Sequence, residues 1–212
     1  MSLPVTDHFT GTSGTDLHVY NAGWTEQRAS DTVCEISGVG GGSGNTAWGK
    51  PGGSEAAVKW DGDTFTGDQY AQCKAVNASN YGGPTVRQTG TTVATQNGYL
   101  ALIDGFAIDL QRFDNGVRTN LQGGIGSIGA GDALKLEIVG TTLKVYVNGV
   151  QVGTNQTDST YATGQPGMYF NGAASSELDD WTADTIPSGG GAGFIAKPFK
   201  TPRQAINRSG TY

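Results

Sequence analysis

A retaining glycosidase needs two carboxylates about 5 to 5.5 Å apart, one acting as the nucleophile and the other as the acid. The chain has five glutamates, and its nearest group of carboxylates is Glu177, Asp179 and Asp180. Glu177 and Asp179 would share one face of a strand, where carboxylates are more often solvated or anchor a turn. The sequence therefore offers only a weak candidate for a glycosidase pair.

Other catalytic arrangements are also missing from the sequence. Neither His8 nor His18 lies in a recognisable hydrolase context, and no Gly-x-Ser-x-Gly motif is present. The glycine-rich residues 38–44 lack the lysine of a phosphate-binding loop. We expect a protein that is not an enzyme and that has no cofactor.

Three acidic residues form a weak candidate for a calcium site. Asp61, Asp63 and Asp68 place three oxygen donors within eight residues of a turn. The remaining residues of an EF-hand loop, including its terminal glutamate, are missing. An acidic turn without metal is the favoured interpretation, with calcium as the alternative.

A shallow sugar site requires amphipathic aromatic rings and a few side chains that form hydrogen bonds. Aromatic residues on strands more often pack in the core or against a neighbouring strand, and Trp181, beside Leu178, is expected to be core. The candidates for glycan binding are Trp48, Trp60, Tyr70, Tyr81, Arg87, Tyr99 and Arg112.

The elements that would position these residues are short strands. Leu134, Leu136 and Ile138 alternate with polar residues, which predicts a half-buried strand over 132–139. Asn148-Gly149 predicts a tight hairpin. Further strands are expected at 69–76, 85–88, 98–103, 106–112, 143–147, 150–153, 164–170 and 178–183, with edge strands near 5–10 and 32–36 and a glycine-rich loop over 37–54.

Composition agrees with an all-β protein of this kind. Glycine accounts for 35 of 212 residues, well above the usual share of about 7%. Residues 1–187 contain nine basic and all nineteen acidic residues, and their net charge of −10 argues against nucleic-acid binding by this part of the chain. Neither a signal peptide nor a membrane span is visible. Cys34 and Cys73 are expected to be buried free thiols, with a disulfide as the alternative.

Seven segments, taken in order, resemble the concanavalin A-like, LamG-type jelly rolls of bacterial extracellular proteins and bacteriophage structural proteins. These segments are 68–72 (DQYAQ), 83–87 (GPTVR), 98–99 (GY), 131–140, 143–149 (LKVYVNG), 158–167 and 178–181 (LDDW). The resemblance implies a two-sheet antiparallel jelly-roll sandwich over residues 1–187. It does not specify a function, because this fold hosts lectins, glycosidases, adhesion modules and virion parts.

The C-terminal residues differ from the rest of the chain. A glycine-rich hinge at 188–193 precedes residues 194–212, which contain four of the thirteen basic residues and none of the nineteen acidic ones. We expect an extended arm that binds an acidic protein surface, with disorder or nucleic-acid binding as alternatives. The residues expected to bind are Phe194, Lys197, Phe199, Lys200, Arg203, Ile206, Arg208 and Tyr212.

This organisation looks like that of accessory proteins of tailed bacteriophages. The leading hypothesis is a non-enzymatic virion protein, present in several copies and anchored by its arm to a major capsid or tail protein. Host-surface glycans are possible further partners, and no membrane partner is expected. The first alternative is an extracellular carbohydrate-binding module of a bacterial secreted or surface protein, and the second is a glycosidase of the concanavalin A-like superfamily.

Overall fold

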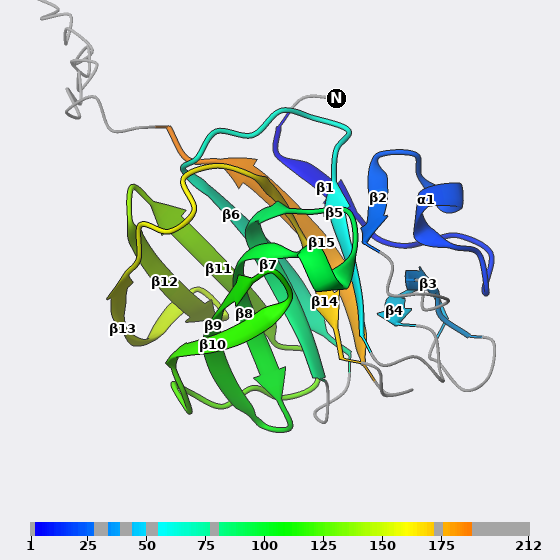
Figure 1. The fold of residues 1–212 in the computed structure, drawn as a ribbon. Coiled ribbons are helices and arrows are strands. Elements are labelled where there is room, and N and C mark those ends of the chain that lie inside the picture. The colour runs from blue at the N-terminus through cyan, green and yellow to red at the C-terminus, as the bar shows by residue number, and fades with distance from the viewer. Residues whose placement is uncertain are drawn as a thin grey trace, which may run out of the picture.

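The computed structural model describes residues 3–27, 34–38, 44–49, 55–76, 81–171 and 176–187, which form two facing antiparallel sheets (Figure 1). The first sheet contains, in order, β13 (Val150–Thr157), β12 (Thr142–Val147), β11 (Ala133–Val139), β6 (Gln69–Ala75), β15 (Glu177–Thr185), β4 (Ala47–Gly49) and β3 (Cys34–Ile36), with β1 (Val5–Asp7) paired to β15. The second sheet contains β10 (Val117–Gln122), β9 (Ala107–Asp114), β8 (Asn97–Asp104), β7 (Tyr81–Thr89), β14 (Gln165–Phe170), β5 (Ala56–Trp60) and β2 (Trp24–Gln27). The short helices are α1 (Leu17–Tyr20) and the 3-10 turn η1 (Val93–Thr95).

The predicted all-β sandwich is confirmed, as are the strands that carry its clearest sequence signals. Leu134, Leu136 and Ile138 of β11 are completely buried between the sheets. Asn148 and Gly149 both have positive φ, at 50° and 79°, as a two-residue hairpin between β12 and β13 requires. Where hydrophobic alternation and turn chemistry agree, the sequence is therefore sufficient to place the strand.

Four strands lie where the sequence predicts none. The strand β4 falls inside the expected glycine-rich loop, because Ala47 and Trp48 are buried in the core and pair with β3 and β15. The strands β2 and β5 pair with each other. The strand β10 is mostly exposed and has no apolar face; it is held by its pairing with β9. Its sequence therefore contains no alternation from which it could be predicted.

Three tryptophans pack at one end of the core. The ring of Trp24 lies 4.6 Å from that of Trp181 and 5.2 Å from that of Trp60, measured between centroids. All three side chains are at least 98% buried, which confirms the expectation that Trp181 is core. The buried carboxylate of Asp7 accepts the indole N–H of Trp24 at 2.9 Å. This contact ties β1 to β2 on opposite sheets.

The second sheet curls so that strands far apart in its order touch across its outer face. Phe113 of β9 contacts Tyr169 of β14 with ring centroids 5.1 Å apart, although β7 and β8 lie between these strands. Arg118 of β10 lies over the Tyr169 ring and 3.6 Å from Glu55, which precedes β5. The outer face therefore has a small hydrophobic cluster of its own, which consists of Ala57, Leu100, Leu102, Phe113 and Tyr169.

Cys34 and Cys73 are both buried free thiols, as the favoured interpretation predicts. They lie on β3 and β6, which are separated in the first sheet by β15 and β4. Burial raises the pKa of both thiols well above the usual value. Both are therefore protonated and unreactive at neutral pH.

We predict that replacing Asp7 with alanine lowers the free energy of unfolding by about 3 kcal/mol, because several donors lose their acceptor in the core. Asp7 accepts hydrogen bonds from the Phe9 amide, the Tyr20 hydroxyl, the Asn21 amide group and the Trp24 indole. Urea unfolding followed by tryptophan fluorescence measures the change. The control is Asp61→Ala, which removes an exposed pair with Lys59 and should cost less than about 1 kcal/mol. Equal losses in the two variants would contradict the role assigned to Asp7.

Candidate ligand-binding pocket

An open pocket of about 460 Å³ lies at one end of the sandwich. Three connections surround it: the β5–β6 loop (residues 61–68), the β11–β12 turn (Gly140 and Thr141) and the β13–β14 loop (residues 158–164). The residues that line it are Thr66, Gly67, Asp68, Arg87, Gly140, Thr141, Ser159, Tyr161 and Ala162.

Arg87 joins the three connections that form the pocket. Its guanidinium donates hydrogen bonds of 2.7 Å to the carbonyl oxygens of Gly67, Gly140 and Tyr161, one on each connection. The side chain is only 4% exposed, and the Asp68 carboxylate lies 3.7 Å away. Burial lowers the pKa of Arg87, but an arginine remains charged at neutral pH. The pocket therefore has a fixed cationic group beneath it.

The backbone of β7 bends to direct this side chain. Arg87 has a φ of 51°, in the left-handed region that non-glycine residues seldom adopt, and its amide donates to the buried Gln69 side chain. Gly164 packs directly against it, so a Cβ atom there would lie 2.3 Å from the Arg87 carbonyl carbon. A larger residue at position 164 would displace Arg87 and the loop together.

A second network holds the β13–β14 loop from its other side. Asp158 accepts hydrogen bonds from the Tyr99 hydroxyl at 2.8 Å and from Arg112 at 2.6 Å. Arg112 also pairs with Asp114, which accepts the Tyr161 hydroxyl at 2.7 Å. The Tyr161 amide in turn donates to the Tyr99 oxygen. The chain of contacts closes on itself and fixes Tyr161 at the pocket wall.

This network also sets the ionisation of Asp158. Burial alone would raise the pKa of its carboxyl, but hydrogen bonds from Thr160, Tyr99 and Arg112 outweigh burial and lower the pKa to about 2. The pKa of Tyr99 rises to about 12, chiefly through burial. At neutral pH the network therefore combines a carboxylate with neutral phenols.

The walls of the pocket suit a ligand that carries many hydroxyl groups. Thr66, Thr141 and Ser159 are exposed hydroxyl residues on the three different connections. The half-buried ring of Tyr161 supplies an apolar surface beside them, and Asp68 supplies an acceptor. Convergent polar groups next to an aromatic ring are what a shallow saccharide site requires.

Of the seven residues expected to bind glycan, only Arg87 lines the pocket. Arg87 lines the pocket, while Tyr99 and Arg112 lie behind it and hold its loop. Trp48 and Trp60 are buried in the core, where their indole N–H groups donate to Glu35 and Asp63, so their ring faces are not open to a sugar.

The two remaining candidates, Tyr70 and Tyr81, do not line the pocket. Tyr70 lies on the outer face of the first sheet, with the Lys135 ammonium 5.2 Å from its ring centroid. Tyr81 is partly exposed at the start of β7, whereas Arg87 lies near the end of that strand. Tyr161, Ser159 and Thr141 carry no sequence signal of their own, because they become neighbours only when the loops fold.

The expected calcium ligands each have a separate partner. Asp61 pairs with Lys59, Asp63 accepts the indole N–H of Trp60, and Asp68 accepts the Gly140 amide. The Trp60 hydrogen bond lowers the pKa of Asp63. Within the described part of the chain, these three carboxylates do not gather their oxygens at one point.

The weak glycosidase candidates also differ from expectation. Glu177 is 97% buried and accepts a hydrogen bond from Thr46, so it does not lie on a solvated face. Asp179 is half-buried, and burial raises the pKa of its carboxyl. The predicted arm, residues 194–212, and its hinge at 188–193 lie outside the described residues, and the expected binding positions on the arm stay predictions.

Comparison with known proteins identifies solved structures that share this fold. No family model matches the chain, and no curated protein matches its sequence. Among solved structures, the carbohydrate-binding module CBM66 from Bacillus subtilis aligns with a TM-score of 0.55 and 18% identity, over 80% of this chain and 94% of that chain. A galectin-like protein of unknown function from Bacillus subtilis gives 0.57 and 11%, over 85% and 94% of the two chains. Domain 4 of the extracellular GH43 arabinanase AbnA from Geobacillus stearothermophilus, in complex with arabinotriose, gives 0.52 and 12%, over 85% and 90%.

The chain has a concanavalin A-like β-sandwich fold. At 11 to 18% identity, the similarity establishes the fold but not the ligand. In the described residues, no helix has the length and apolar character needed to span a membrane.

We predict that Arg87→Lys lowers the free energy of unfolding by about 2–4 kcal/mol, because one ammonium cannot reach three carbonyls in different directions. Amide hydrogen exchange should accelerate at Gly140, whose amide is held by Asp68 beside this contact. The matched control is Arg118→Lys, which keeps a charge beside Glu55 at a more exposed site. A native exchange rate in Arg87→Lys would contradict the joining role of the guanidinium.

We predict that Asp158→Asn makes the free energy of unfolding less dependent on pH below about pH 5. The folded-state pKa of about 2 lies below the unfolded value of about 3.9, so ionised Asp158 stabilises the fold above about pH 4. That contribution disappears as the pH falls through about 2. From pH 5 to pH 2, native protein should lose about 1–2 kcal/mol more than the variant does.

Chemical unfolding at several pH values measures this difference. Asp104→Asn, at the exposed end of β8, is the control and should follow the native profile. Parallel profiles for native protein and Asp158→Asn would disprove the assignment.

Proposed function

We propose that this protein binds carbohydrate at the Arg87 pocket and does not cleave it. The observation that carries the proposal is the convergence of three exposed hydroxyl side chains, a carboxylate and a tyrosine ring on loops that Arg87 joins. A saccharide presents hydroxyl groups at its edge and an apolar C–H face, so it can use both kinds of wall. The volume of about 460 Å³ is sufficient for a short stretch of sugar units.

Two features favour a binding site that is formed before the ligand arrives. The guanidinium of Arg87 holds all three connections, and Asp158 holds the β13–β14 loop at its beginning. Binding to such a site does not require loop ordering, which otherwise reduces affinity. The carbohydrate-binding module and the arabinotriose-bound domain that share this fold make a saccharide the natural ligand class to test.

The Arg87 charge shapes the expected ligand. Three of its five N–H groups are bound by carbonyls, and the adjacent Asp68 carboxylate balances part of its charge. A strongly anionic polymer would therefore gain little from this cation and would be repelled by Asp68. Neutral oligosaccharides fit the pocket better.

The decisive variant is Thr141→Ala combined with Ser159→Ala, which removes two exposed hydroxyls and leaves the Arg87 contacts in place. A glycan array followed by titration of the strongest neutral oligosaccharide should show affinity at least about tenfold weaker than native, since each lost hydrogen bond costs about 0.5–1.5 kcal/mol. Thr119→Ala, exposed on β10, is the matched control and should bind as native protein does. The bound oligosaccharide should keep its length on prolonged incubation.

Native affinity in the double variant would place any glycan site elsewhere on the sandwich. Absence of binding by the native chain to every neutral glycan would reject the proposed function itself. Shortening of the oligosaccharide would reject the non-enzymatic part of the proposal.

A further inference from the structure

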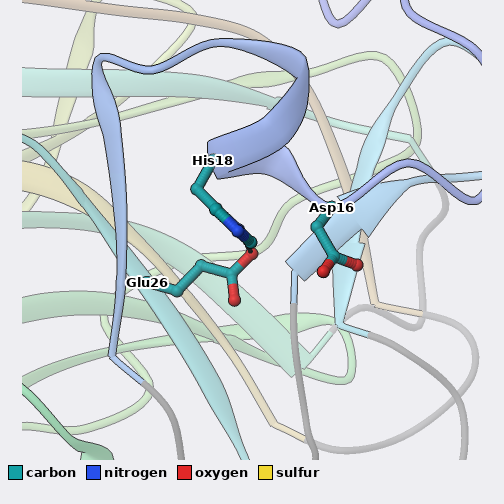
Figure 2. Close-up of side chains that lie close together, drawn as sticks. All are labelled: Asp16, His18 and Glu26. Carbon is teal, nitrogen blue, oxygen red and sulfur yellow. Dashed lines mark hydrogen bonds and ion pairs between the residues drawn. The ribbon is translucent and has the colours of Figure 1, made fainter.

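Three potential metal ligands meet beside α1, away from the Arg87 pocket. Asp16 precedes the helix, His18 lies within it and Glu26 lies on β2, and one ligand atom of each falls within 4.8 Å of the others. His18 Nδ1 is 2.7 Å from Glu26 Oε1. Figure 2 shows the His18 and Glu26 side chains directed toward each other, with Asp16 beside them. The trio therefore brings one imidazole and two carboxylates to a single point.

Asp16 lies at the start of α1, but its carboxylate does not cap the helix. Asp16 occupies the N-cap position of α1, where an aspartate ordinarily accepts a backbone N–H of the first turn. Here its side chain makes no capping hydrogen bond. Backbone pairing of Asp16 with Glu35 instead fixes the residue against β3. The main chain of Asp16 is thus held at the edge of β3, and its side chain does not cap the helix.

The other two ligands are held on different supports. Glu26 is 4% exposed in its side chain and belongs to β2, which pairs with β5 along four residues. His18 is 36% exposed and stands on the helical turn over that strand. A depression of about 290 Å³, lined by His18, Trp24, Thr25 and Glu26, opens beside them. An ion can therefore enter from solvent, and water has room to complete its coordination.

We propose that Asp16, His18 and Glu26 bind a divalent transition-metal ion of the Zn²⁺ class. Imidazole nitrogen favours such ions over Ca²⁺ and Mg²⁺, which prefer sites made entirely of oxygen. The ion lies between His18 Nδ1 and Glu26 Oε1, any proton on Nδ1 being released to water, and Asp16 is the third protein ligand. Three protein ligands leave a coordination position for water or an external ligand. The site is separate from the proposed glycan pocket and does not depend on it.

Equilibrium dialysis of the chelator-treated full chain against Zn²⁺ tests the proposal. Native protein should bind about one ion per chain at this site. His18→Gln, Glu26→Gln and Asp16→Asn should each weaken binding at least about tenfold. Co²⁺ in place of Zn²⁺ should give a visible absorption band that the same three variants lose.

The chain provides its own control, because its only other histidine is also paired with a carboxylate. His8 Nδ1 lies 2.6 Å from Asp180, and its side chain is 64% exposed. His8→Gln should bind Zn²⁺ as native protein does. Circular dichroism verifies folding, and should one variant misfold, the other two still decide the result.

Two outcomes would overturn the assignment. The first is native protein that binds no stoichiometric Zn²⁺. The second is Zn²⁺ binding that does not depend on the proposed site. In that case either His8→Gln weakens binding as much as His18→Gln does, or none of the three site variants weakens it. Either result leaves the proposed carbohydrate binding untouched, because that is measured on a different pocket with different variants.

Discussion

The buried guanidinium of Arg87 is the constraint on which the functional end of this sandwich depends. Removing a charged group from water is costly unless hydrogen-bond partners and an opposite charge replace the lost hydration. Here three carbonyl oxygens accept hydrogen bonds from the guanidinium, and a nearby carboxylate supplies the opposite charge. Each carbonyl belongs to a different connection. The guanidinium is stable in this buried position only if the carbonyls of the three loops lie close to it. The loops held in this way surround the pocket. Arg87 is thus first a structural residue and only then part of a binding surface.

The β13–β14 loop is held by side chains behind the pocket as well as by Arg87. Tyr99 and Arg112 are on neighbouring strands, where the rigid second sheet fixes their separation, and both direct hydrogen bonds to Asp158. The position of the loop that carries Ser159 and Tyr161 is therefore fixed by the sheet. A scaffold of this kind can change its ligand by altering exposed loop residues while the supporting contacts persist.

The sequence was most informative where the structure is local. Alternation in β11 and the Asn148-Gly149 turn depend on neighbours along the chain, and both were predictable. The strand β10 exists through pairing with β9, a contact that its own polar residues do not encode. The aromatic and arginine residues were recognised by type, but type alone does not separate buried Trp48 from pocket-lining Arg87. That distinction depends on which sheet face each residue occupies and on a left-handed turn at Arg87 that no pattern reveals.

The tryptophan cluster lies between the helical corner that carries the Asp16–His18–Glu26 trio and the β5–β6 loop. Trp24 lies beside the Asp16–His18–Glu26 trio and packs edge to face on Trp60 at 5.2 Å. The indole of Trp60 donates to Asp63 in the β5–β6 loop, which also supplies Thr66, Gly67 and Asp68 to the pocket. A rigid aromatic pair thus connects the helical corner to one pocket wall. Because aromatic packing is dense, Trp24 and Trp60 give the helical corner and the β5–β6 loop a common support, whereas the Arg112 side of the pocket has its own support from β9.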